Sequence, residues 1–374
     1  MKIHPPFPAV ARRHRLLPII LLAASLCPFA VAATPIEPVA QAEAYRDGRP
    51  AARSRVGVKD QGIVLRHGDG PGQCDYLGAR DVWVWEHAGT YYMHYDGAGP
   101  TGWLVCLATS KDLVNWTKHG AVLGLGRPGE NDSASASYGV TFFNGRDWDM
   151  FYLGTPNTTP PPYLIPGFPY LTLKAQGPSP AGPWTKQRDV IPFGTKPGTF
   201  YSATASPGQV VRHGDEYLMF FSASTDQPIL RTLGLARTKD LDGPWTIDPQ
   251  PLLPPTEQVE NSTLYHDEPS GTWYLFTNHV GLHPQLEYTD AIWVYWSQDP
   301  TKWDPAHKAI VLDGKSCPWS REIIGLPSVV KVGNRLAIFY DGSTAPEMPP
   351  LYLSHMKRDI GLAWLDLPLL PPKN

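Results

Sequence analysis

Short apolar and aromatic runs, separated by glycine-containing turns, recur along the chain from residue 75 onward. In the first copy, the run 82–85 leads through Gly89 to an aromatic run at 91–95, and a further run at 107–110 is followed by Trp116. Runs of this length, rich in aromatic and β-branched residues and bounded by turn residues, are typical of β-strands. The pattern therefore predicts many short strands.

The same set of runs recurs along the rest of the chain, giving five copies. The first four copies each close on a tryptophan, and these residues lie 58 to 68 positions apart: Trp116, Trp184, Trp245 and Trp303. Long repeats that each hold several strands are typical of propeller blades. The sequence predicts an all-β fold, a five-bladed β-propeller of four-stranded blades that spans residues 75–374.

The fifth copy is incomplete, because proline-rich sequence follows Leu367 where an outermost strand is expected. Residues 33–74 form an N-terminal extension that contains an apolar segment at 62–66. We expect this segment to supply the missing strand and to close the ring.

Composition supports strands over helices. The chain has 34 glycines and 41 prolines among 374 residues, and only 18% of its residues are charged. Proline removes a backbone donor and clashes with the preceding helical turn, so coiled coils and helical bundles are excluded. The net charge of −3 carries no electrostatic footprint of nucleic-acid binding.

Residues 1–32 have the composition of a secretory signal peptide. Lys2, Arg12, Arg13 and Arg15 precede an apolar run at 16–31 that ends in small residues at 30–32. A basic start, a short apolar stretch and small residues at a cleavage site are typical of export signals. We expect a secreted or periplasmic protein that holds no membrane segment after cleavage.

Three cysteines remain after that cleavage: Cys74, Cys106 and Cys317. Their spacing matches no metal-binding pattern. An oxidising compartment permits one disulfide among them, and the sequence leaves the pair open.

The repeat separates structural acids from candidate functional acids. Asp112, Asp240 and Asp299 recur before the closing tryptophans, and Asp96 and Asp341 recur before glycines, so all five are interpreted as turn residues. In a propeller, the residues just before each innermost strand line a central funnel. Five other acids do not recur in the same way, and the repeat places them near the mouth of this funnel: Asp75, Asp81, Asp132, Glu260 and Glu322. Each could instead cap a turn or pair with Arg80 or Arg321. Taken together, they predict a carboxylate site in which neighbouring charges shift the pKa values of its members.

Three segments of the first repeat resemble a known superfamily. The residues at 80–84 (RDVWV), those at 89–95 (GTYYMHY) and the run at 107–116 (LATSKDLVNW) are similar to the opening blade of the five-bladed β-propeller glycoside hydrolases. That group includes family 43 arabinofuranosidases and xylosidases, family 32 fructosidases, family 117 anhydrogalactosidases and family 130 mannoside phosphorylases. The resemblance covers residues 75–366 and assigns no subfamily.

The resemblance implies roles for the acids. An Asp at the start of blade one acts as base or nucleophile in those families, and Asp81 stands there. Their general acid is usually a Glu, but blade three of this chain carries no acid at 201–206. Glu260 in blade four is the nearest substitute and Glu322 its rival, while Asp132 fits the role of tuning the acid.

Candidate sugar-binding residues surround these acids in the expected funnel: Asp75, Arg80, Tyr138, Tyr201, His279 and Arg321. His279 could bind a sugar hydroxyl, ligate a central cation or be a structural histidine. No cofactor is required and no metal-ligand residues are assigned. The funnel leaves room for a central structural cation such as calcium.

These observations favour an exported hydrolase that cleaves a plant or algal oligo- or polysaccharide, with Asp81 as base and Glu260 as acid. Glycoside hydrolysis needs one protonated and one ionised carboxyl flanking the bond. Two other functions stay open. The missing blade-three acid favours a glycan-binding propeller without catalysis, and Arg80, Arg231 and Arg321 could meet the anion of a phosphate-dependent phosphorylase.

Overall fold

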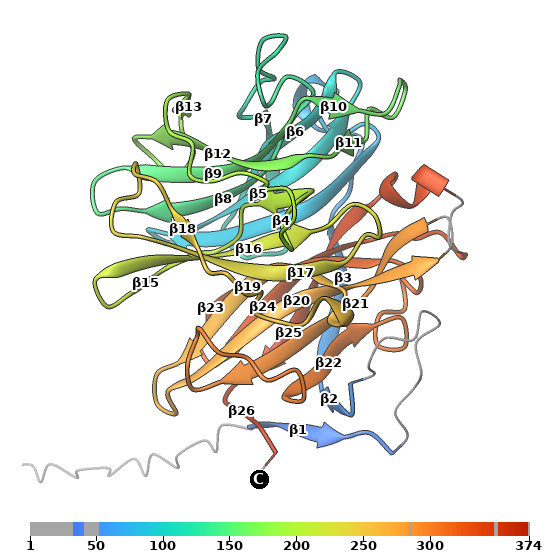
Figure 1. Cartoon of the computed structure of the whole chain (residues 1–374). Helices are drawn as coiled ribbons and strands as arrows, with labels where there is room; N and C mark the ends of the chain where they lie inside the picture. The colour runs from blue at the N-terminus through green and yellow to red at the C-terminus, as the bar shows by residue number, and fades with distance from the viewer. Residues whose placement is uncertain (1–32, 41–51, 284–285, 348–350, 373–374) are drawn as a thin grey trace, which may run out of the picture. The chain divides into compact units, whose positions relative to one another are not determined.

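The computed structural model describes residues 33–40, 52–283, 286–347 and 351–372. The expected signal peptide at 1–32 lies outside these residues. Within the described residues, no helix is long and apolar enough to cross a membrane. The described part of the chain contains strands and three short 3-10 helices, without an α-helix (Figure 1), so the all-β prediction is confirmed.

Antiparallel pairing sorts most strands into consecutive units. The first contains β4 (Gly78–His87), β5 (Thr90–Gly99), β6 (Gly102–Ser110) and β7 (Trp116–Ala121). The second contains β8 (Ser135–Phe143), β9 (Trp148–Thr155), β12 (Tyr170–Gly177) and β13 (Thr185–Lys186). A small hairpin, β10 (Asn157–Thr158) and β11 (Pro166–Gly167), is inserted between β9 and β12.

The later units follow the same plan. The third contains β14 (Thr204–Ser206), β15 (Val210–His213), β16 (Glu216–Ser224), β17 (Arg231–Thr238) and β18 (Thr246–Ile247). The next contains β19 (Val259–Asp267), β20 (Thr272–His283), β21 (Leu286–Ser297) and β22 (Lys308–Asp313). The last contains β23 (Ile324–Val332), β24 (Arg335–Gly342) and β25 (Asp359–Asp366).

The N-terminal extension adds a strand to this last unit. β3 (Lys59–Leu65) pairs antiparallel with β25, with Ile63 opposite Gly361. The strand expected near 62–66 therefore forms at the outer edge of β25, while the blade count and the closure of the ring stay predictions. The remaining elements are β1 (Thr34–Pro38), β2 (Ser54–Val56), β26 (Leu369–Leu370) and the 3-10 helices η1 (Pro71–Gln73), η2 (Pro255–Glu257) and η3 (Leu351–His355).

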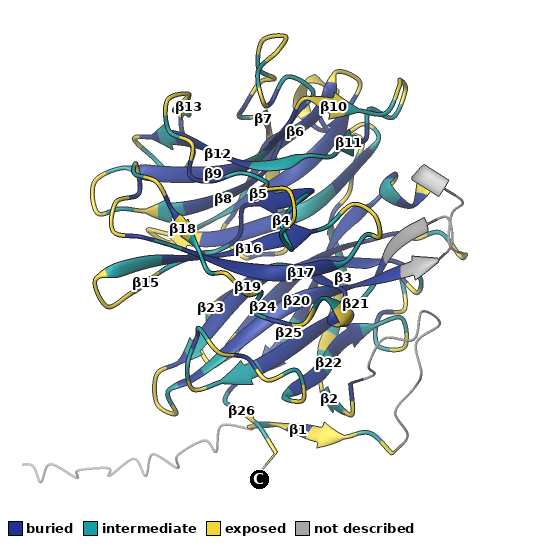
Figure 2. Ribbon diagram, viewed as in Figure 1, coloured by how far each residue is buried: buried dark blue, intermediate teal, exposed yellow. Residues whose placement is uncertain are grey.

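Apolar clusters lie between consecutive units. One cluster packs Val82 and Tyr95 of the first unit against Phe339 and Leu362 of the last. Figure 2 shows the interiors of the strands buried and the connecting loops exposed. Burial of these faces against one another is the main favourable term in folding, so each unit depends on its neighbours.

The recurring Asp before each closing tryptophan is structural. Asp112 Oδ1 accepts the N–H groups of Val114 and Asn115 at 3.0 and 2.8 Å. Asp240 and Asp299 accept the N–H groups of the residues two positions on, at 3.0 and 2.9 Å. These Asx turns confirm the turn interpretation of the three acids. The three cysteines of this part of the chain are buried and present as thiols.

Candidate active site

Bulges in the innermost strands turn residues toward one end of the fold. In β4, β8, β19 and β23 the pairing register shifts at 80/83, 137/140, 260/262 and 325/328. At each shift one residue has a positive φ: Asp81 (51°), Tyr138 (46°), Asn261 (54°) and Leu326 (20°). Such φ values are uncommon for residues with a side chain and gather at functional sites. The bulges thus make Asn261 the counterpart of Asp81, and they make Glu260 the counterpart of Arg80.

A side chain from a neighbouring unit accepts the backbone N–H at three of the four bulges. Asp341 accepts the N–H of Asp81 at 2.9 Å, and Asp96 accepts the N–H of Tyr138. Ser222 Oγ accepts the N–H of Asn261 at 2.8 Å. Asp96 and Asp341, interpreted from sequence as turn residues, are buried acceptors between units.

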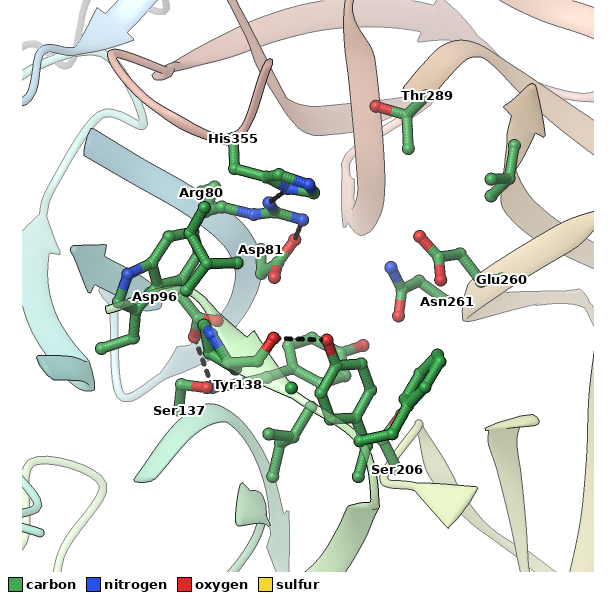
Figure 3. Close-up of a pocket in the computed structure, with 18 of the residues that line it drawn as sticks. Arg80, Asp81, Asp96, Ser137, Tyr138, Ser206, Glu260, Asn261, Thr289 and His355 are labelled. Carbon is green, nitrogen blue, oxygen red and sulfur yellow. Dashed lines mark hydrogen bonds and ion pairs between the residues drawn. The ribbon is translucent and has the colours of Figure 1, made fainter. Parts of the chain in front are cut away.

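The bulges surround a cavity of about 320 Å³. Figure 3 shows Arg80, Asp81 and His355 on one side of it, with Glu260 and Asn261 on the other. Asp96 and Tyr138 also line this space. The structure therefore brings together four of the residues predicted from sequence: Asp81, Glu260, Arg80 and Tyr138.

Arg80 contacts both Asp81 and His355 on its side of the cavity, which we call the first wall. Its Nη2 lies 3.2 Å from Asp81 Oδ1 and its Nη1 lies 2.7 Å from His355 Nδ1. Burial and the three arginines nearby hold the pKa of His355 well below its ordinary value, so the imidazole is neutral. Because Nδ1 faces a guanidinium, it accepts, and the ring hydrogen sits on Nε2. His355 can therefore donate a hydrogen bond to a ligand in the cavity.

The opposite wall carries an ion pair. Arg231 Nη1 lies 2.5 Å from Glu260 Oε2, and the two side chains are only 8% and 14% exposed. A guanidinium this close in a shielded position favours the charged form of a carboxylate. Glu260 therefore faces the cavity as a carboxylate.

Asp96 is a buried acid on the first wall. It is 2% exposed and lies beside Asp81 (Figure 3). Burial, and then the neighbouring charge of Asp81, raise the pKa of Asp96 well above its ordinary value. The neutral form of this carboxyl is therefore favoured relative to that of an exposed aspartate.

Asp75 and Asp132 lie outside this cavity, in buried ion pairs. Lys118 Nζ lies 2.6 Å from Asp75, and Tyr152 Oη lies 2.9 Å from Asp132, which also pairs with Lys186. Both carboxylates are at most 2% exposed. They share one arrangement of tyrosine, carboxylate and lysine that ties strands within a unit. Neither is among the described residues that line the cavity, so the structure does not bring them to the other predicted site residues.

The other four predicted residues are also placed elsewhere. Tyr201 packs against Phe200 and Phe221. His279 is buried, stacks on Trp293 with ring centroids 3.8 Å apart, and contacts Asp290 through Nδ1 at 3.1 Å. Arg321 and Glu322 lie in the loop before β23, outside the set of described residues that lines the cavity. The structure therefore does not bring these four residues to Asp81 and Glu260, and their contact with substrate stays a prediction.

Sequence reasoning missed the roles of Asp96, His355, Asn261 and Arg358 in this cavity. Asp96 could have been found by asking which acid faces the backbone of the next repeat. His355 lies in η3, outside the repeated strands, so the repeat carried no signal for it. Among the described residues, no group of three or more His, Cys, Asp or Glu side chains is arranged to hold a metal ion.

The raised pKa of Asp96 predicts a pH-dependent stability. A carboxyl whose pKa is higher in the folded than in the unfolded protein supports stability below its unfolded value of 3.8, and that support is lost as pH rises through the folded pKa. Asp96→Asn keeps the acceptor for the Tyr138 N–H without the charge. We expect the free energy of unfolding of Asp96→Asn, measured in urea, to increase relative to that of the parent as pH rises from 4 to 8.

Asp112→Asn is the control for this prediction. Hydrogen bonds from Asn115 and Val114 lower the pKa of the exposed Asp112. Its contribution to stability is present above the unfolded pKa of 3.8 and is lost only as pH falls below that value, so the pH curves of Asp112→Asn and the parent should run parallel between pH 4 and 8. Parallel pH curves for Asp96→Asn and the parent would contradict a protonated Asp96.

Comparison with known proteins places the fold. No protein-family model matches the sequence, and no curated protein does. Among solved structures, a complex of BT0996 with RGII matches at a TM-score of 0.63 and 16% identity, over 85% of this chain and 96% of that one. The catalytic domain of a GH62 α-L-arabinofuranosidase from Coprinopsis cinerea matches at 0.60 and 14%, over 82% and 96%.

A family 117 glycoside hydrolase of the marine bacterium Zobellia galactanivorans, Zg3597, matches at a TM-score of 0.55 and 16% identity, over 83% of this chain and 90% of that one. The chain has the fold of these β-propeller glycoside hydrolases. The resemblance found in the first repeat is confirmed at that level. Because the identities are 14–16%, the activity has to be argued from the cavity itself.

Proposed function

We propose that the protein is a glycoside hydrolase whose reacting groups are the carboxyls on the two walls of this cavity. The observation that carries the proposal is the opposition of Glu260, paired with Arg231, to Asp81 and the buried Asp96, whose pKa is raised. Cleavage of a glycosidic bond needs one protonated and one ionised carboxyl on opposite sides of it. The two walls supply those two states at the same pH.

The electrostatics assign the roles. The Asp81–Asp96 pair gives its proton to the glycosidic oxygen as the bond to the anomeric carbon breaks. Glu260 serves the other face of the sugar, where water adds to that carbon and loses a proton to the carboxylate. This order exchanges the roles expected from sequence, because Arg231 favours a charged Glu260 and burial favours a protonated Asp96.

The rest of the wall is suited to sugar hydroxyls. His355 presents Nε2–H as a donor, and Asn261 presents a side-chain amide on the opposite side. Arg80 and Arg231 are each engaged with a carboxyl of the cavity, which balances their charge. This balance supports a neutral glycan of plant or algal origin as substrate over a phosphate co-substrate.

Export is part of the proposal. The basic residues and apolar run within 1–32 support secretion or delivery to the periplasm. Extracellular polysaccharides and their fragments are the substrates met there.

A substrate screen tests the proposal. The full-length protein is incubated with 4-nitrophenyl glycosides of common pentoses, hexoses and deoxyhexoses, and with arabinan, xylan and agar oligosaccharides. We expect release of free sugar in phosphate-free buffer. Release of sugar 1-phosphate only when phosphate is added would establish a phosphorylase, and binding without any product would establish a glycan-binding propeller. Either result would replace the hydrolase assignment.

A further inference from the structure

Apolar residues line the cavity beside its polar groups, and several come from one inserted segment. Ile165, Pro166 and Phe168 come from the inserted β10–β11 hairpin, and Ile229 comes from the loop between β16 and β17. We call these four residues the apolar wall. Phe168 is half-buried, and its ring lies 4.9 Å from that of Tyr170 and 6.0 Å from the Arg231 guanidinium. The Arg231 contact places the wall next to the Glu260 ion pair.

The backbone of the hairpin has already used its polar groups. The carbonyl of Pro166 accepts the Tyr170 hydroxyl at 2.8 Å, and the carbonyl of Gly167 accepts the Thr155 hydroxyl at 2.6 Å. The carbonyl of Phe168 accepts the Asn157 amide at 2.6 Å. A ligand hydroxyl placed here would compete with hydrogen bonds that are already made.

Backbone groups of Ile165 and Ile229 are hydrogen-bonded as well. Ile165 donates its N–H to Thr159 Oγ1 at 2.9 Å, and its carbonyl accepts the Thr159 N–H at 2.9 Å. The carbonyl of Ile229 accepts the Gln258 amide at 3.3 Å. A buried hydroxyl without a partner costs free energy, whereas a buried methyl group gains it.

The wall is also fixed in position. Trp103 donates its indole N–H to the carbonyl of Tyr163 at 3.0 Å. Ile165 is 7% exposed and packs in a cluster with Trp103 and Met356. These contacts anchor the hairpin to the first unit and to the residue that follows η3. The wall therefore presents an apolar surface of defined shape beside the reacting carboxyls.

We infer that the apolar wall selects a sugar that carries a methyl group where most hexoses carry a hydroxymethyl, namely a 6-deoxyhexosyl unit. The inference rests on the proposed hydrolase function and names its substrate class. The polar groups of the cavity, including Arg80 and Glu260, would bind the ring hydroxyls, and the methyl group would contact Phe168. A single methyl or hydroxyl difference in such a pocket is worth about 10–200-fold in kcat/KM.

Matched substrate pairs test the inference. They are the 4-nitrophenyl glycosides of α-L-rhamnose and α-L-mannose, of α-L-fucose and α-L-galactose, and of β-D-fucose and β-D-galactose. Within each pair only the substituent at C5 differs, so leaving group and anomeric configuration are held constant. We expect the 6-deoxy member of the cleaved pair to be preferred by about 10–200-fold in kcat/KM.

A variant then assigns the preference to the wall. Phe168→Ala should lower kcat/KM for the 6-deoxy member and leave its partner nearly unchanged, so that the ratio falls about tenfold. Phe168→Leu, which keeps apolar bulk, should retain most of the ratio and guards against misfolding of the alanine variant. Phe143→Ala is the matched control, since Phe143 is 45% exposed and lies outside the lining residues described.

The outcomes separate the inference from the proposed function. Equal cleavage within a pair, or cleavage of pentosides alone, would overturn the inference and leave the hydrolase in place. A preference for benzyl over methyl glycosides of one sugar, without a preference within the pairs, would assign the wall to the aglycone and overturn it as well. Absence of cleavage across the whole screen would overturn both.

Discussion

Glu260→Gln and Asp81→Asn should each lower kcat on methyl glycosides by about 10²–10⁴-fold, the usual range for loss of one acid–base group. Each amide keeps the size of its parent side chain and removes the charge or the proton. Both side chains are partly exposed to the cavity, at 14% and 17%, so the fold should survive. Steady-state kinetics on purified variants, with circular dichroism as a check of folding, give the measurement.

The leaving group distinguishes the two roles. A 4-nitrophenolate leaves without help from a proton, whereas an alkoxide needs one. Asp81→Asn should therefore recover most of its lost rate on 4-nitrophenyl glycosides, and Glu260→Gln should stay impaired on both classes. The reverse pattern would restore the roles expected from sequence, with Glu260 as the acid.

Glu322→Gln is the matched control for this pair. Glu322 was the rival acid on sequence grounds, and the structure places it in the loop before β23, among the described residues that do not line the cavity. Its amide variant should keep the activity of the parent on both classes of substrate. A loss as large as that of Glu260→Gln would show that the reacting carboxyls are assigned to the wrong residues.

The sequence was sufficient to predict the strands and the fold class. Glycine-containing turns and alternating aromatic runs are local signals, and they mark β5, β9 and β24 directly in the repeat. Pairing β3 with β25 needed only the observation that the last repeat lacks a strand. Local hydrophobic pattern and chain length therefore account for most of the architecture.

The site was harder to predict because its geometry depends on bulges. A bulge adds one residue to a strand, and a shift of one residue sends a side chain to the other face. Because of these bulges, the residue equivalent to Asp81 in the fourth unit is Asn261, and Glu260 lies one position earlier. Nothing in the spacing of a single sequence marks that extra residue.

The paired acids show a second limit. Asp75 and Asp132 occupy equivalent positions before β4 and β8. Their partners Lys118 and Lys186 come from β7 and β13, 43 and 54 residues further along the chain. Whether a carboxylate faces a cavity or a buried lysine is decided by these distant strands. A repeat shows which positions are equivalent, but it does not show whether the side chains at those positions are exposed to a cavity.

Arg358→Met is expected to destabilise the protein by about 3–5 kcal/mol, the usual cost of leaving one member of a buried ion pair alone. Arg358 Nη1 lies 2.6 Å from Asp341 Oδ1, and the two side chains are 1% and 0% exposed. Arg358 also donates to the carbonyl of Ser354 at 2.9 Å. Urea unfolding followed by tryptophan fluorescence measures the loss.

The double variant Arg358→Met with Asp341→Asn separates the charge from the hydrogen bond. Asp341 accepts the N–H of Asp81 through Oδ2, and an asparagine at 341 retains an oxygen for that bond. The double variant buries no unpaired charge, so it should recover part of the stability lost in Arg358→Met, a non-additivity that the mutant cycle measures directly. Additive losses would mean that the ion pair contributes nothing beyond its separate members. If stability is recovered and kcat remains low, Arg358 also maintains the position of Asp81 in the cavity, and this buried ion pair of the last unit is part of the support for the reacting carboxyls.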